Sequence, residues 1–305
     1  MTRIDLLLLV IGLIGLAVGG CNGRSASPDT LSFREQAVRA QAETDPEYRA
    51  RRLTVIGYRQ GKAMDRSGSA ETLRLAWDAC KAIPSAGARS KAWTLIAKVH
   101  AELNNDPKAR EATKLALDSA AEIESAERRA AALAAAAEVQ SLTLDKTAAA
   151  ATLKKAEELA NSIVDPQGKT LALCAVAESN WKSGQTPEAD RVIAAALNFA
   201  GAIDDLKKRW PALAAIAVRQ AEMKQPEAAA ATFDLSLESA RAIDDQYARA
   251  YALGELAERL SAAGFRAKAH RLLVEAESEA EKIPQPDLQQ LALEKIRSLM
   301  GKLPR

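Results

Sequence analysis

The chain has 305 residues, of which 48% are hydrophobic but only 4% aromatic, so it can bury a large core made mostly of small aliphatic side chains. Lysine and arginine together number 42 and aspartate and glutamate 40, which leaves a net charge of +2 with no basic block. This balance gives no electrostatic reason to expect nucleic-acid binding.

The first 20 residues have the layout of an export signal. Arg3 precedes an apolar run from Leu6 to Gly20, which is shorter than the roughly 20 residues that a membrane-spanning helix needs. The end of this run resembles the bacterial lipoprotein signal, with "VGG" at 18–20 in the lipobox positions before Cys21. The resemblance implies that residues 1–20 are removed and that lipids on Cys21 anchor the protein to a membrane.

The lipoprotein resemblance also implies a location. It predicts a lipid-anchored protein of the bacterial cell envelope that faces the periplasm. Asn22 stands where an aspartate would signal retention at the inner membrane, so the outer membrane is favoured. Asp5 departs from the usual basic start, and an uncleaved anchor, or a cleaved signal with an incidental cysteine, is the alternative. Residues 21–30 are polar and predict a short tether.

The rest of the chain, residues 31–300, repeats with a period of 40. An isoleucine column recurs without insertion or deletion at Ile83, Ile123, Ile163, Ile203, Ile243 and Ile283. Alanine and leucine columns keep the same step, which is the signature of a repeat array. The predicted units are residues 45–84, 85–124, 125–164, 165–204, 205–244 and 245–284.

Each unit reads as two helices. Helix-capping residues recur two positions after the isoleucine column, at Ser85, Ser125, Asp165, Asp205 and Asp245, and Asp45 stands in the same column at the start of the first unit. The first helix of a unit should end near Asn104, Gly184 or Gly264, residues that accept a left-handed backbone. Apolar residues between these signals follow helical spacing, and no segment alternates like a strand. We therefore predict an all-α, right-handed α-solenoid of six 40-residue helix-turn-helix repeats, with half-repeat caps at 31–43 and 287–300.

The helix columns resemble the tetratricopeptide repeat (TPR). Trp93, Ile96 and Ala97 fit its first-helix pattern, and Ala229, Phe233 and Ser236 fit its second. The resemblance covers residues 45–284. The unit is longer than the 34 residues usual in that family, and HEAT-like repeats, with a period nearer 40, are the alternative name for the same architecture.

In tetratricopeptide repeats the first helices line a concave groove that binds peptides or partner proteins. Carried over column by column, the resemblance implies the groove residues Arg51, Tyr58, Lys62, Lys91, Lys98, Glu138, Glu178, Trp181, Lys182, Glu222, Tyr251 and Glu258. This groove would be basic in the first two units and acidic later, which could orient an extended partner. Trp181 stands in a column of glycine, alanine and serine, so we expect an exposed binding residue. The alternative is a solvated charged face, with Trp181 packed on a neighbouring turn.

No residue pattern predicts catalysis, a metal site or a cofactor. His100 and His270 lie too far apart in the array to share a site, and Cys80 and Cys174 occupy columns of small buried residues. The "GKT" at 168–170 lacks the earlier glycine and the strand of a phosphate-binding loop, and reads as a helix start. An enzyme is therefore not expected.

The function predicted from the sequence is a lipid-anchored interaction module that binds a protein or peptide partner in its groove, with no nucleic-acid ligand. The alternative is a structural spacer or a self-assembling scaffold of the envelope.

Overall fold

The computed structural model describes residues 31–302, and no strand occurs in this range. Its odd-numbered helices are α3 (Pro46–Lys62), α5 (Ala86–Glu102), α7 (Ala126–Leu142), α9 (Pro166–Lys182), α11 (Leu206–Glu222), α13 (Gln246–Ala262) and α15 (Pro286–Lys302). Its even-numbered helices are α2 (Phe33–Gln41), α4 (Arg66–Lys81), α6 (Asp106–Ala121), α8 (Lys146–Asn161), α10 (Thr186–Gly201), α12 (Pro226–Arg241) and α14 (Arg266–Ala280). The predicted signal, Cys21 and the tether lie outside the described residues.

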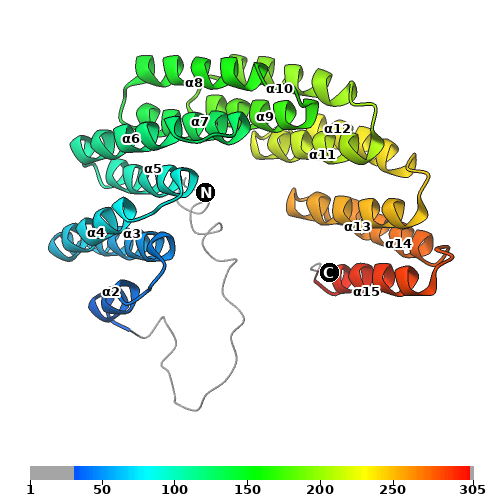
Figure 1. The fold of residues 1–305 in the computed structure, drawn as a ribbon, viewed down its shortest axis with the longest axis horizontal. Coiled ribbons are helices and arrows are strands. Elements are labelled where there is room, and N and C mark those ends of the chain that lie inside the picture. The colour runs from blue at the N-terminus through cyan, green and yellow to red at the C-terminus, as the bar shows by residue number, and fades with distance from the viewer. Residues whose placement is uncertain (1–30, 303–305) are drawn as a thin grey trace, which may run out of the picture.

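The helices form an open arc with two layers (Figure 1). Each odd-numbered helix from α3 to α13 packs on the even-numbered helix that follows it, and it also contacts the next odd-numbered helix. The odd-numbered helices therefore line the inner, concave side, and α4 to α14 form the outer layer. Single helices, α2 and α15, close the two ends. This confirms the predicted α-solenoid of six helix pairs with a half-repeat cap at each end.

The outer helices spread apart, and ion pairs bridge some of the spaces between them. Arg191 on α10 binds Glu157 on α8 through two hydrogen bonds of 2.8 and 2.7 Å. Arg241 on α12 makes the same two-pronged contact with Glu275 on α14, at 2.7 Å for each bond. These pairs are solvent-exposed, so each contributes little to stability, about 0–1 kcal/mol.

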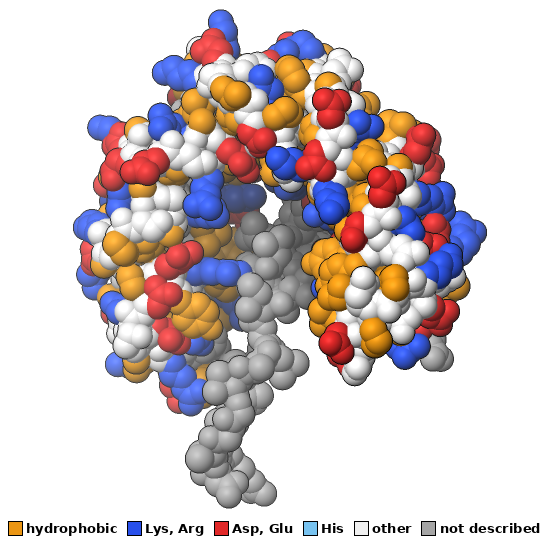
Figure 2. All heavy atoms as spheres, turned by 45° about the vertical axis from the view of Figure 1, so that its right-hand side comes forward, with side chains coloured by type: hydrophobic (Ala, Val, Ile, Leu, Met, Phe, Trp, Pro, Cys, Tyr) orange, Lys and Arg blue, Asp and Glu red, His pale blue; other side chains and the backbone are white. Residues whose placement is uncertain are grey.

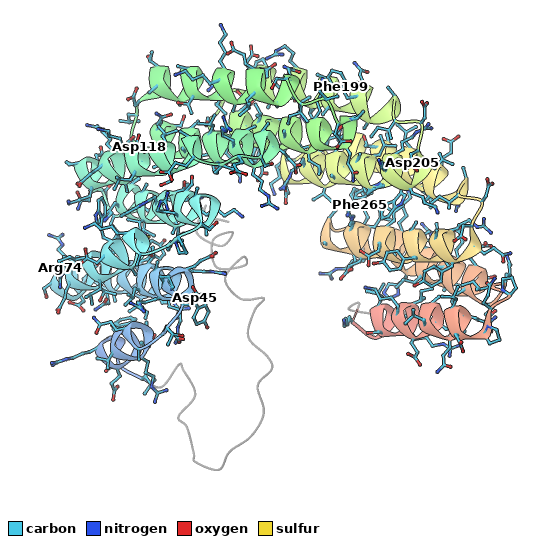
Figure 3. All side chains as sticks on the ribbon, viewed as in Figure 1. Asp45, Arg74, Asp118, Phe199, Asp205 and Phe265 are labelled. Carbon is cyan, nitrogen blue, oxygen red and sulfur yellow. The ribbon has the colours of Figure 1, made fainter. Side chains whose placement is uncertain are left out.

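Each inner helix from α3 to α13 has an N-cap residue whose side chain caps the first turn, as the sequence predicts. The six residues of the predicted capping column all accept a hydrogen bond from a backbone N–H in the first helical turn: Asp45, Ser85, Ser125, Asp165, Asp205 and Asp245. Figure 3 labels two of them, Asp45 and Asp205. At the start of α9 the backbone N–H of Gly168 donates to Asp165 (2.7 Å), so "GKT" is a capped helix start.

The same six helices end in a left-handed residue. Asn104, Gly184 and Gly264 have φ values of 58, 79 and 92°, which confirms the predicted caps, and Met64, Leu144 and Lys224 take the same conformation in the other units. After α7 the N–H of Leu144 donates to the carbonyl of Ser141 (3.2 Å) and that of Asp145 to the carbonyl of Gln140 (2.9 Å), the two bonds of a Schellman motif.

Because this left-handed conformation recurs, we predict opposite changes in the free energy of unfolding for substitutions at two of these positions. Leu144 is 81% exposed with φ 62°, so its side chain gains little from burial and bears the steric cost of a left-handed backbone. We expect Leu144→Gly to raise the free energy of unfolding by about 0.5 kcal/mol, and Gly184→Ala to lower it by about 1 kcal/mol. Urea denaturation of both variants checks this; equal effects of the same sign would contradict it.

An arginine column, which we did not predict from the sequence, holds the turns between repeats. Arg129 Nε donates to the carbonyl of Ile123 (2.8 Å), and Arg89 Nη1 to the carbonyl of Ile83 (3.0 Å). Arg209 and Arg249 make the same contact with Ile203 and Ile243, whereas the unit of Ile163 has Lys169 at this position. The column thus satisfies turn carbonyls that the helices leave without a partner.

Small residues allow the two helices of a unit to approach closely. The hydroxyl of Ser69 donates to the carbonyl of Gly57 (2.7 Å), and that of Ser90 to the carbonyl of Ala116 (2.9 Å). A Cβ added at Gly57 would lie 2.7 Å from Cγ of Leu73, so this contact has no room for a side chain. The alanine-rich composition is therefore what the close packing of the array requires.

The concave face

Four positions of the repeat face the concave side, spaced by about one helical turn. They are the columns of Arg51, Val55, Tyr58 and Lys62, which recur every 40 residues along the inner helices. Contacts between successive inner helices run through these columns, for example Glu255 to Lys295 (3.1 Å) and Glu138 to Lys182 (3.6 Å). All 12 groove residues predicted from the sequence lie on inner helices, although Tyr58 is buried and Trp181 is partly buried against the core.

Tyr58 is the first correction. The sequence places it in the groove, but its side chain is only 7% exposed and packs with Leu73, Val99 and Leu103. Burial, together with a hydrogen bond to Glu102, raises its pKa to about 12. These neighbours come from α4 and from the next unit, so the Tyr58 side chain fills the space between α3, α4 and α5.

Trp181 is the second correction. It is only partly exposed and packs against the core cluster that contains Leu173 and Met223. The neighbouring repeat explains this, because the equivalent Gly61 lies against Leu103, and a Cβ there would be 2.7 Å from Leu103 Cδ2. The column therefore faces the next repeat, and a large residue at this position fills the interface between repeats. A Trp181→Ala variant would test packing and not ligand binding.

The centre of the concave face carries a network of ion pairs, and this corrects the predicted acidic half. Glu178 on α9 binds Lys182 (2.5 Å) and also Arg219 on α11 (2.8 Å), and Arg219 binds Glu222 (2.6 Å). The Glu138 carboxylate accepts a hydrogen bond from Ser179 (2.8 Å). Glu138 and Glu178 are thus largely neutralised.

The same network shifts the pKa of its cations. Burial alone would lower the pKa of Lys182, but Glu138 and Glu178 beside it raise the pKa above its ordinary value. Arg219 behaves alike, since Glu178 and Glu222 outweigh its burial. Lys182 and Arg219 are therefore charged at neutral pH. The sequence did not reveal the role of Arg219, because its partner lies one repeat plus one residue earlier.

Four basic residues face the hollow from the N-terminal arm. Lys62 and Lys91 are exposed, Arg51 and Lys98 are half-buried, and none of the four forms an ion pair with a carboxylate among residues 31–302. Lys62 Nζ lies 5.7 Å from the ring centroid of Tyr58. Figure 2 shows blue side chains that project into the hollow from this arm. The four predicted basic residues thus lie together on this arm without a carboxylate partner among the described residues.

An apolar pocket of about 140 Å³ lies between α13 and α15. Its walls include Tyr251 and Leu291, which are 46% and 53% exposed, with Ile296 at its base. Figure 2 shows hydrophobic side chains on the inner edge of this arm. Tyr251 was predicted as a groove residue. We did not predict Leu291, although it stands 40 residues after Tyr251, because α15 was read only as a cap.

Glu222 and Glu258 complete the predicted set, and both are exposed on the inner helices. Glu222 is held by Arg219, whereas Glu258 forms no ion pair among the described residues. The concave face thus has three zones: a basic arm on α3 and α5, a neutralised centre on α7 to α11, and an apolar pocket between α13 and α15.

The thiols of Cys80 and Cys174 and the imidazole of His100 are buried in the interior. Burial raises the pKa of both Cys80 and Cys174 to about 12, so neither thiol is ionised at neutral pH. Burial also lowers the pKa of His100, whose ring lies 6.4 Å from that of Trp77. Within residues 31–302, no group of three or more histidine, cysteine or acidic side chains could hold a metal ion, and no helix is long and apolar enough to cross a membrane.

Fold and concave face together define a helical-repeat protein of the α-solenoid class. Neither a family model nor a curated protein matches the chain. Among solved structures, it is similar to Ton1535 from Thermococcus onnurineus NA1, at 14% identity and a TM-score of 0.45, over 86% of this chain and 94% of that one. It is also similar to the Rap protein complexed with Competence and Sporulation Factor, at 14% identity and a TM-score of 0.35, over 89% and 79% of the two chains.

Proposed function

We propose that this protein binds a protein or peptide partner on its concave face and acts as a lipid-anchored interaction module of the bacterial envelope. One observation carries the binding proposal. Basic and apolar side chains stay exposed on the inner helices at the two arms, whereas the charges at the centre of the same face are paired within the chain. Unpaired charge and an exposed apolar pocket on one face are typical of a recognition surface.

A capture experiment with charge-reversed bait tests the binding proposal. The full chain, solubilised in detergent, is compared with a Lys91→Glu/Lys98→Glu variant against envelope extracts. We expect the variant to retain about a tenth of the partner, because two favourable contacts become repulsive. The matched control is Lys114→Glu/Lys155→Glu, at exposed lysines of the outer helices α6 and α8. Equal retention by both variants would support the spacer or scaffold function instead.

Membrane anchoring is a separate proposal that rests on the resemblance of residues 1–21 to a lipoprotein signal. In a bacterial host grown with alkyne-labelled palmitate, the wild-type chain should carry the label and partition with the membranes, preferentially the outer one. Cys21→Ser should lose both the label and the partitioning, since the acyl chains supply the membrane affinity. Membrane partitioning of the serine variant equal to that of wild type would indicate an uncleaved anchor.

A further inference from the structure

Resting on the proposed function, we infer that the ligand is an extended polypeptide with two separate recognition elements. An acidic stretch binds the basic arm on α3 and α5. A large apolar side chain, about 12 residues away, enters the pocket between α13 and α15. The centre of the concave face holds the intervening residues without selecting their sequence.

The basic arm requires acidic partner groups. Lys91 and Lys98 lie two helical turns apart on α5, and Arg51 occupies the position on α3 that is equivalent to Lys91. Three cations of later inner helices each have a carboxylate partner: Lys182 has Glu178, Arg219 has Glu222, and Lys295 has Glu255. Arg51, Lys91 and Lys98 have no such partners among the described residues, so their charges repel one another. Carboxylates of a ligand would relieve this repulsion.

The pocket requires an apolar group of limited size. Its volume of about 140 Å³ is far below that of a cofactor site and suits one large side chain. Lys295 is already paired with Glu255 and lies 5.9 Å from the ring centroid of Tyr251, so the charges at the pocket leave no demand for a charged ligand group. Leu288, 39% exposed, extends the apolar surface of α15.

The centre sets the spacing and excludes a uniformly acidic ligand. Four steps separate α5 from α13 along the inner layer, and at about 10 Å a step they span about 40 Å, or about 12 extended residues. Ala135, Ala175 and Ala215 keep this path open, because they occupy a concave column with minimal side chains. Beyond them Glu258 is exposed, forms no ion pair among the described residues, and would repel a polyanion. Negative charge on the ligand is therefore confined to the end that lies on α3 and α5.

The test is selection from a displayed library of random peptides of about 16 residues, with the full chain in detergent as target. Enriched peptides should carry an acidic cluster and, about 12 residues away, one large apolar residue. Selection on Lys91→Glu/Lys98→Glu should lose the acidic preference and keep the apolar one. Selection on Tyr251→Ala should do the reverse, and Lys114→Glu/Lys155→Glu should match wild type.

Other outcomes separate this inference from the proposed function. Ala175→Trp fills the centre of the concave face, and its helicity is checked by circular dichroism. Peptides that are lost on Ala175→Trp but show no acidic or apolar preference would overturn this inference and leave groove binding intact. Peptides indifferent to Ala175→Trp, or no enriched peptide, would overturn both. Labelled heparin that outcompetes every peptide, with an affinity unaffected by Tyr251→Ala, would overturn the inference in favour of a polyanion surface.

Discussion

Leu173→Ala is expected to lower the free energy of unfolding by about 3 kcal/mol. Leu173 is fully buried on α9, in a cluster that joins residues of α7, α8, α10 and α11. Truncation removes contacts to both neighbouring repeats and leaves a cavity that stacked helices cannot easily close. Because each repeat is stabilised by its neighbours, the loss should also weaken coupling between the two halves of the array. Urea denaturation followed by circular dichroism measures the change.

Leu133 provides the matched control for this substitution. It stands in the same column on α7 but is only partly buried. Leu133→Ala should therefore cost clearly less than Leu173→Ala, since less apolar surface is lost from the core. Hydrogen exchange should show the greatest loss of protection in α9 and its neighbours for the Leu173 variant. A cost of Leu133→Ala equal to or above that of Leu173→Ala would contradict the packing described here.

Ala177→Leu is expected to cost about 2–3 kcal/mol although leucine is a good helix former. Ala177 is fully buried and stands in the column of Gly57, where an added Cβ would already meet Leu73 at 2.7 Å. The larger side chain would force α9 away from α10. Ala194→Leu, at an exposed position of α10, is the control and should change stability by less than about 0.5 kcal/mol. Equal stability of the two variants would show that the alanine column does not set the helix spacing.

The periodic features of the fold could be predicted from the sequence because they depend on local chemistry. A capping residue such as Asp205 binds the first turn of its own helix, and Gly184 ends its own helix. Because such residues recur every 40 positions, both ends of the helices could be predicted. The arginine column is equally periodic and was available, but arginine on a helix surface does not by itself indicate which carbonyl it binds. Its role became clear only from the geometry of the turn.

The site was harder to predict because its exceptions depend on the adjacent repeat. Trp181 looked exposed from its column, yet the column faces a neighbour, as Gly61 against Leu103 shows. Glu178 looked free, but Arg219 reaches it from the next repeat. Predicting the pocket would have required the position of α15 relative to α13, and the assignment of residues 287–300 as a cap does not give that position. Column membership thus identifies a face of a helix, and the residues of the next unit decide whether that face is open.

Photo-crosslinking from defined positions tests most directly whether the concave face is the binding surface. Benzoylphenylalanine is introduced at Lys91 or Tyr251 on the inner helices, and at Lys114 or Lys155 on the outer ones, all of them exposed. After irradiation of intact cells, adducts are separated by mass. We predict a discrete partner adduct from Lys91 and Tyr251 and none from Lys114 and Lys155. Adducts confined to the outer positions, or equal from both layers, would contradict the account.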